Sequence, residues 1–218
     1  KTLETISLLK VSGVFFVALL EEYDKILLGA AKLFMRVGIK SVSMDDIARD
    51  LGISKKTIYK HFTDKRDLVR CVLDSSISAE QNACKICFET DDNAIRKMIN
   101  LSKFVSQAHQ TMNPAVIYDL QKYYPSQWKR FEEFRVGFVS DSIKLNLKDG
   151  QSEGLFREKI NPEIISSLYV LLVKGLISYF SENKTNYDFV TLHKQLVTYH
   201  LYGICSAQGL TYLEQHIN

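Results

Sequence analysis

The stretch that decides the fold runs from residue 43 to residue 68 and reads SMDDIARDLGISKKTIYKHFTDKRDL. Ser43 followed by Asp46 three residues later is the pattern of a capping box, which begins a short helix. Gly52 can end that helix, because glycine adopts the left-handed backbone of a tight turn without steric cost. A second short helix is expected over residues 55–61. The stretch therefore predicts two short helices joined by a tight turn.

The two faces of this helix pair differ in chemistry. An apolar seam can lock the helices together and consists of Ile47, Leu51, Ile53, Ile58 and Phe62. The outward positions of the second helix carry the hydrogen-bond donors that a helix lying in the major groove of DNA requires; they are Lys55, Lys56, Thr57, Tyr59, Lys60 and His61. Residues 22–70 contain 11 Lys+Arg against 7 Asp+Glu, while the whole chain has a net charge of +3. We therefore expect this segment to meet a polyanion.

The rest of the chain carries the helix-start and helix-end signals of an all-α protein. Residues 22–37 carry apolar side chains at helical spacing, with Gly38 as the closing residue, and a further helix begins near Asp64. Each of the 3 prolines stands at the expected start of a helix. No segment shows sustained alternation of apolar and polar residues, so we expect no sheet. A loop is expected between Gly150 and Gly154, and the later helices are expected at 93–111, 114–122, 125–148, 162–181, 187–203 and 209–216.

The run from Ile47 to Leu68, with the preceding segment ILLGAAKLFMRVGIKSVS (26–43), resembles the DNA-binding domain of TetR-family regulators. The resemblance covers about residues 22–70. It implies that Lys56 and Thr57 read bases and that Tyr59 contacts the DNA backbone. The complete set of DNA-binding residues that it implies is Ser43, Ser54, Lys55, Lys56, Thr57, Tyr59, Lys60, His61 and Lys65, with Lys65 beside a phosphate. For Arg49, DNA contact and plain solvation both remain open.

Three parts of the chain are expected. Residues 1–21 form an N-terminal extension, residues 22–70 the helix-turn-helix domain, and residues 71–218 a ligand-sensing and dimerisation domain. The apolar run Val11–Leu20 lacks a small-x-small cleavage site and is shorter than the ~20 residues of a membrane span. We interpret it as an extra helix or an irregular start. Cys84 and Cys87 form a lone C-x-x-C, and we expect reduced thiols without a metal.

Aromatic side chains gather in the first half of the expected sensing domain. Helices that face one another with aromatic side chains and a few polar tips are how a helical bundle builds a ligand cavity. The alternative is plain core packing, which is common for aromatic residues at helical spacing. The candidate pocket residues are Phe104, His109, Met112, Tyr118, Trp128, Phe131 and Phe138.

Two late helices, 162–181 and 187–203, are apolar almost all round. A helix with two apolar faces must bury both, one in its own core and one against a partner. The resemblance implies a homodimer built from these helices, and a two-fold dimer suits DNA with two half-sites. The candidate interface residues are Leu168, Leu172, Ile177, Leu196 and His200.

These features together predict a bacterial, cytoplasmic, ligand-responsive transcriptional regulator. We expect a repressor that a small molecule releases from its operator. Its expected partners are double-stranded operator DNA, a second copy of the chain and an effector that the sequence does not identify, with no cofactor and no membrane. The alternative is a constitutive or architectural DNA-binding dimer without an inducer. An enzyme is disfavoured, because no Ser/His/Asp, paired-carboxylate or phosphate-loop arrangement stands out.

Overall fold

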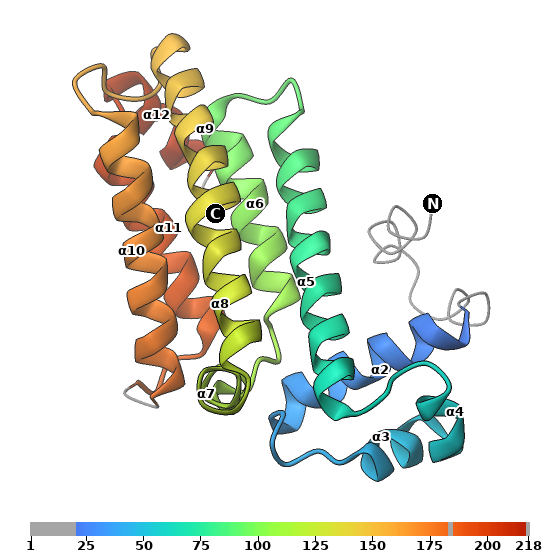
Figure 1. Cartoon of the computed structure of the whole chain (residues 1–218). Helices are drawn as coiled ribbons and strands as arrows, with labels where there is room; N and C mark the ends of the chain where they lie inside the picture. The colour runs from blue at the N-terminus through green and yellow to red at the C-terminus, as the bar shows by residue number, and fades with distance from the viewer. Residues whose placement is uncertain (1–20, 183–184, 217–218) are drawn as a thin grey trace. The chain divides into compact units, whose positions relative to one another are not determined.

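The computed structural model describes residues 21–182 and 185–216, so the apolar run 11–20 and the extension 1–21 lie outside the described residues except for Glu21 (Figure 1). Within the described ranges the regular elements are helices, joined by one isolated β-bridge between Phe156 and Cys205. The expected all-α fold is confirmed. The elements are α2 (Glu22–Val37), α3 (Met44–Leu51), α4 (Lys55–Tyr59), α5 (Lys65–Phe88), α6 (Ala94–Ala108), α7 (Pro114–Tyr123), α8 (Pro125–Phe134), the π-helical turn η2 (Arg135–Val139), α9 (Ser140–Ser152), α10 (Pro162–Ser181), α11 (Phe189–Ile204) and α12 (Ala207–His216).

The chain divides into two compact units, which we call the head unit and the body unit. The head unit contains the residues up to Glu80 together with Thr111–Phe131, and the body unit contains Gln81–Gln110 and the residues from Glu132 onward. This division differs from the expected boundary at residue 70. Helix α7 and most of α8 belong with the helix-turn-helix, although about forty residues of chain separate them from it.

The core of the head unit joins residues from distant parts of the sequence. Ile47 and Ile58 are fully buried, and they belong to one apolar cluster with Val116 and Leu120 of α7. Because the cluster includes side chains from α2, α3, α4 and α5 as well, the two short helices are held from behind by the rest of the unit. This arrangement stabilises elements that are too short to be stable alone.

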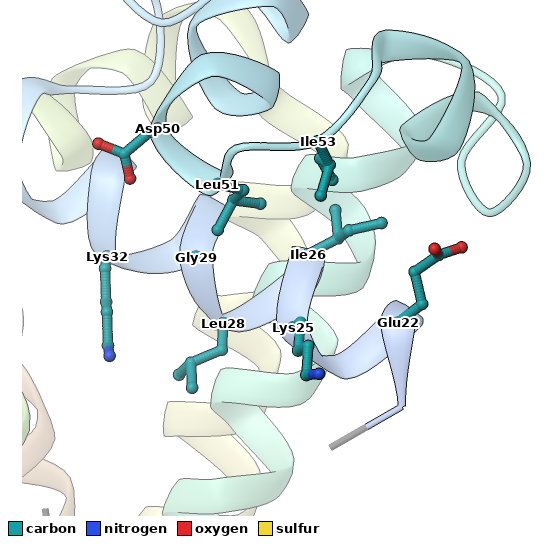
Figure 2. Close-up of a pocket in the computed structure, with 9 residues that line it drawn as sticks. All are labelled: Glu22, Lys25, Ile26, Leu28, Gly29, Lys32, Asp50, Leu51 and Ile53. Atoms are coloured by element: carbon teal, nitrogen blue, oxygen red, sulfur yellow. The ribbon is translucent and has the colours of Figure 1, made fainter. Parts of the chain in front are cut away.

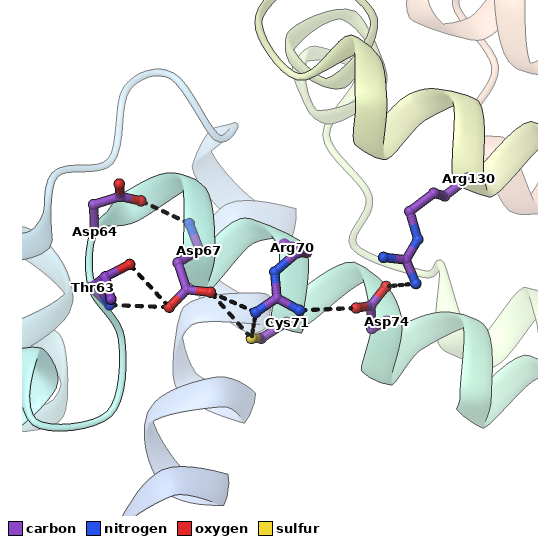
Figure 3. A network of polar contacts seen from close by, with 7 residues as sticks. All are labelled: Thr63, Asp64, Asp67, Arg70, Cys71, Asp74 and Arg130. Carbon is purple, nitrogen blue, oxygen red and sulfur yellow. Dashed lines mark hydrogen bonds and ion pairs between the residues drawn. The ribbon is translucent and has the colours of Figure 1, made fainter.

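Polar contacts add a second link within the head unit (Figure 3). The Asp64 carboxylate accepts the backbone N–H of Asp67 at 2.8 Å and so caps the start of α5. Arg70 pairs with Asp67 at 2.6 Å and with Asp74 at 3.4 Å, and Arg130 of α8 pairs with Asp74 at 2.9 Å. The hydrogen bond from Arg70 is the main reason that the pKa of Asp67 lies below its usual value. The network ties α8 to α5.

The body unit is built from helices that pack around one apolar cluster. Its fully buried members include Ile95 of α6, Leu147 of α9 and Leu201 of α11. The expected helices are present here, with ends within a few residues of the expected ones. The expected loop at Gly150 is wrong, because α9 continues to Ser152. Gly150 is needed inside the helix, since a Cβ there would overlap the ring of Phe156.

Helix α10 combines high hydropathy with a largely exposed surface. Among the described residues it is the helix whose length and mean hydropathy of 1.7 would suit a membrane span, and 33 % of that segment is buried. It packs against α9 and α11 in the body unit. Its apolar residues therefore serve the unit's own core on one side and remain exposed on the other.

Candidate nucleic-acid interface

Helix α3 begins with the capping box that the sequence indicates. The Ser43 hydroxyl accepts the backbone N–H of Asp46 at 3.1 Å, and the Asp46 carboxylate accepts the backbone N–H of Ser43 at 2.9 Å. The Ser43 hydroxyl also donates to the Asp46 carboxylate at 2.6 Å, and this contact, together with the backbone N–H of Ser43, holds the pKa of Asp46 below its usual value. Gly52 follows the helix with φ 65° and ψ 29°, the left-handed conformation expected for the turn. The start and the end of α3 are therefore both fixed by local chemistry.

Helix α4 follows after three residues and has a cap of its own. The Ser54 hydroxyl accepts the backbone N–H of Thr57 at 3.0 Å and lies 2.9 Å from the Thr57 hydroxyl. Ile58 is fully buried and Phe62 is 1 % exposed, so they anchor the rear of the helix. The expected second helix over 55–61 is shorter in the structure, because residues 60 and 61 form a turn. Ser54 and Thr57 thus form the N-terminal cap of α4.

The front of α4 is exposed and cationic. The side chains of Lys55, Lys56, Tyr59 and Lys60 all lie at the surface. Lys55 forms an ion pair with Asp45 of α3 at 3.0 Å, and this contact raises its pKa. Lys56 and Lys60 form no ion pair within the part of the chain that the structure describes. Two lysines and a phenol beside a buried apolar anchor are suited to phosphates and base edges.

Three further residues of the expected DNA-binding set have partners inside the head unit. His61 lies 2.8 Å from the carboxylate of Glu22 and 6.0 Å from the ring of Tyr23. Lys65 is half-buried, and its ammonium group donates to the carbonyl of Lys40 at 3.3 Å. Ser43 is engaged in its capping box. Arg49, left open by the sequence, is exposed and pairs with Asp46 at 3.2 Å.

The candidate pocket residues do not come together within one unit. Met112, Tyr118, Trp128 and Phe131 belong to the head unit, whereas Phe104, His109 and Phe138 belong to the body unit. Tyr118 is 46 % exposed, and its hydroxyl accepts a hydrogen bond from Lys122 at 2.7 Å. Ring contacts join Trp128 to Phe131 at 5.8 Å, Phe138 to Phe134 at 5.8 Å, and His109 to Phe189 at 5.2 Å. An effector pocket lined by these seven residues stays a prediction.

The candidate interface residues divide into exposed and buried members. Leu168 and Leu172 are 48 % and 46 % exposed, as an interface requires. Ile177 and His200 are 5 % and 7 % exposed, and Leu196 is half-buried. The side chains of Ile177 and His200 therefore pack inside the subunit. Because α10 is apolar almost all round, the sequence alone does not distinguish its inner from its outer residues.

The head unit also has a surface hollow that the sequence did not indicate (Figure 2). Its volume is about 520 Å³, and it lies where the turn after α3 passes over α2. Gly29 permits the close approach, since a Cβ there would overlap the side chain of Leu51. The lining residues are Glu22, Lys25, Ile26, Leu28, Gly29, Lys32, Asp50, Leu51 and Ile53.

A metal site is not built by the described residues. They contain no group of three or more His, Cys, Asp or Glu side chains that could hold an ion. Cys84 and Cys87 lie on α5 and form no disulfide within the described residues; the first is buried and the second half-buried. Burial raises the pKa of the Cys87 thiol, which makes it a poorer metal ligand and nucleophile.

The capped helix pair, its buried rear and its cationic front define a helix-turn-helix DNA-binding protein. Residues 26–72 match the family model of bacterial regulatory proteins of the tetR family. The HTH-type transcriptional regulator YvaF of Bacillus subtilis is 24 % identical over 133 residues, which cover 60 % of this chain and 68 % of that protein. Residues 26–72 therefore form a helix-turn-helix domain of the TetR family, as the sequence resemblance indicated.

Solved structures share the fold along most of the chain. A TetR-family regulator from Agrobacterium tumefaciens has a TM-score of 0.66 at 19 % identity, covering 85 % of this chain and 98 % of its own. A transcriptional regulator from Saccharomonospora viridis, solved in complex with choline, has a TM-score of 0.57 at 20 % identity, covering 84 % and 97 %. At these identities the likeness concerns the fold.

Proposed function

We propose that the protein is a homodimeric repressor that holds operator DNA with the α4 helix of each subunit and releases it when a small molecule binds. It would act in the bacterial cytoplasm. The observation that carries the DNA-reading part is the exposed front of α4, with Lys56 and Lys60 open and Ile58 buried behind them. We assign Lys56 and Thr57 to base edges and Tyr59 to the DNA backbone.

The surface of α10 supports a dimer. Its exposed apolar side chains are spaced by three, four or seven residues, apart from one adjacent pair, and so form one face; they are Ile164, Leu168, Leu171, Leu172 and Tyr179. Tyr199 and Tyr202 of α11 are 74 % and 45 % exposed, and α11 packs against α10. An apolar surface over two adjacent helices favours burial against a partner. We assign a second copy of the chain, because a two-fold dimer covers both copies of the patch and brings two heads to DNA.

Two buried histidines of α11 support the binding of a small molecule. His193 and His200 are 4 % and 7 % exposed and lie seven residues apart, which places them on one face of the helix. Within the described residues, Nδ1 of His193 and Nε2 of His200 have no hydrogen-bond partner. A buried polar atom without a partner costs about 1–3 kcal/mol, and a hydrogen-bonding ligand would remove that cost.

The ionisation of these histidines narrows the chemistry of the effector. Burial lowers the pKa of His193 and of His200 to about 4, and for His193 the nearby His109 adds to the effect. Both rings are therefore neutral near pH 7 and suit an uncharged hydroxyl, carbonyl or amide rather than an anion. The choline complex of the Saccharomonospora viridis regulator supports a small-molecule role for this fold in general.

Selection of duplexes from a random library by the purified protein tests the proposal. A dimer of two DNA-reading heads should enrich an inverted repeat. The centres of its two half-sites should lie about 10–10.5 base pairs apart or slightly farther. Footprinting should then protect both half-sites. No enrichment would contradict DNA reading, and enrichment of a single half-site would contradict the dimeric arrangement.

A further inference from the structure

The loop between α2 and α3 is held at the backbone of one residue, Lys40, by two other helices. The backbone N–H of Lys40 donates to the Asp119 carboxylate at 2.6 Å, and the carbonyl of Lys40 accepts from the Lys65 ammonium at 3.3 Å. Asp119 lies on α7 and is 5 % exposed, while Lys65 is the first residue of α5. Both hydrogen bonds involve a charged group, which makes them stronger than neutral ones. We call Lys40, Lys65 and Asp119 the loop clamp.

Neighbouring contacts hold the same loop against α7. The backbone N–H of Asn113 donates to the carbonyl of Met35 at 2.8 Å, and the Lys40 ammonium lies 4.9 Å above the ring of Tyr123. Gly38 has φ 93°, and a Cβ there would lie 3.1 Å from the Cβ of Ala115. The loop and α7 are therefore in close contact along several residues, with the clamp at its centre.

The position of Lys65 differs from that of the lysines on α4. Its side chain is half-buried, and removal from water lowers its pKa, while the charge of Asp119 acts in the opposite direction. Its ammonium group donates to the Lys40 carbonyl, so one of its hydrogen bonds is made inside the head unit. A lysine that serves mainly as a phosphate contact would be expected at the surface, as Lys56 and Lys60 are.

We propose that Lys65 and Asp119 are positioning residues for DNA binding, which act by fixing the loop that leads into α3. Lys40 precedes the cap residue Ser43 by three positions, so a shift of Lys40 passes directly to the start of α3. Because α3 and α4 are joined by a short turn, the clamp sets how α4 is presented to DNA. Lys65 contributes to affinity through the loop and not through its own phosphate. This inference rests on the proposed DNA-binding function.

The test compares Lys65→Gln and Asp119→Asn with the unmodified full chain. Binding to a labelled random-sequence duplex is measured over a NaCl series, well below each variant's melting temperature. Each substitution should weaken binding about tenfold, the effect expected when one charge-assisted hydrogen bond no longer holds the loop. The slope of log affinity against log salt should stay unchanged, because no phosphate contact is lost. The double variant should be little worse than either single one, because both residues hold the backbone of the same residue, Lys40.

Three matched variants make the result decisive. Lys60→Gln removes an exposed lysine and should lower the salt slope by about one ion per subunit. Lys65→Arg should restore affinity, since a guanidinium can also donate to the Lys40 carbonyl. Leu147→Ala, a cavity in the body unit, should lower the melting temperature while leaving affinity intact, so instability alone does not explain the losses.

Two results would contradict the positioning role, and a third would contradict the proposed function itself. If Lys65→Gln lowered the salt slope as Lys60→Gln does, or if Asp119→Asn left affinity unchanged, the clamp would have no positioning role. If the unmodified chain bound no DNA at any salt concentration, the proposed function itself would fail, which is a different outcome.

Discussion

The front of α4 and the late helices of the body unit distribute polar and apolar residues in opposite ways. Helix α4 buries Ile58 and exposes its lysines. Helix α10 exposes Leu171 at 61 %, and α11 buries His193 and His200, each with one ring nitrogen that has no hydrogen-bond partner among the described residues. On α4 the polar residues are exposed and the apolar residue is buried, as on an ordinary protein surface. On α10 and α11 this is reversed, because apolar residues are exposed and polar ones are buried. An inverted arrangement indicates contacts that a single copy of the chain does not make by itself.

We therefore expect a different kind of partner at α4 than at the late helices of the body unit. A polar, cationic surface can stay solvated until DNA arrives, so α4 needs no partner for stability. Exposed leucines and unpartnered imidazoles each carry a free-energy cost until something covers them. We therefore expect the body unit to depend on its partners for stability, whereas the head unit depends on its partner for function alone.

The largest expected effect follows from a charge on the exposed face of α10. Leu172→Glu should convert the dimer to monomers and weaken binding to a selected operator by about 100-fold or more, because two linked heads bind far more tightly than one. Sedimentation and fluorescence anisotropy measure the two effects. Ile86→Glu is a matched control, since Ile86 is 59 % exposed on α5 and should tolerate the charge.

A Leu172→Glu protein that remains dimeric at micromolar concentration would place the interface elsewhere. Ile177 does not serve in this test. It is buried inside the subunit, so a charge there would destabilise the fold.

The pH dependence of stability tests the buried histidines. Above pH 6.5, their ordinary pKa, both rings are neutral in the folded and the unfolded chain, and stability is unaffected. As the pH falls from 6.5 toward 4, the unfolded chain takes up protons that the folded chain excludes, so stability decreases. At pH 5 the loss should be about 2 kcal/mol for each histidine. Urea unfolding at pH 7.5 and at pH 5.0 measures it.

His200→Phe provides the control for this prediction. Phenylalanine keeps an aromatic ring next to Tyr169, which lies 4.8 Å from the ring of His200, but has no proton to bind. The variant should lose less stability between the two pH values than the unmodified chain. An equal loss in both proteins would show that His200 is not the group that titrates.

A smaller effect is expected at the cap of α4. This helix has 5 residues, so the hydrogen bond from Thr57 N–H to the Ser54 hydroxyl is a large part of its support. Ser54→Ala should lower the free energy of unfolding by about 1 kcal/mol, and Ser54→Asn should keep the cap. Denaturation with guanidinium compares the three proteins. Unchanged stability in Ser54→Ala would mean that the rear anchor at Ile58 alone holds the helix.

The parts of the fold that depend on local chemistry could be predicted from the sequence. Ser43 and Asp46 form the capping box, Gly52 adopts the left-handed turn, and Asn161 caps α10 ahead of Pro162. In each case the residues that determine the structure lie within a few positions of one another. The outward face of α4 could be predicted for the same reason, because the buried Ile58 fixes which side of the helix points outward.

The parts that depend on distant contacts could not be predicted. Asp119 and Lys40 are 79 residues apart, so no local pattern connects them. Helix α7 was expected outside the head unit for the same reason, because it lies far along the sequence from the helices that it contacts. On α10 the difficulty is different, because apolar residues on nearly all sides give no periodicity to separate Leu172 from Ile177. From the sequence, Gly150 is expected in a loop. Its place inside a helix is explained only by the neighbouring Phe156 ring, which leaves no room for a Cβ.

The central claim is that the front of α4 reads DNA sequence, and one measurement tests it directly. Affinity is measured for Lys56→Ala on a selected operator and on a random duplex of equal length, with Lys103→Ala, an exposed lysine of α6, as the control. We expect Lys56→Ala to lose about 1–3 kcal/mol of preference for the operator, while Lys103→Ala keeps it. An unchanged preference in Lys56→Ala would contradict the claim.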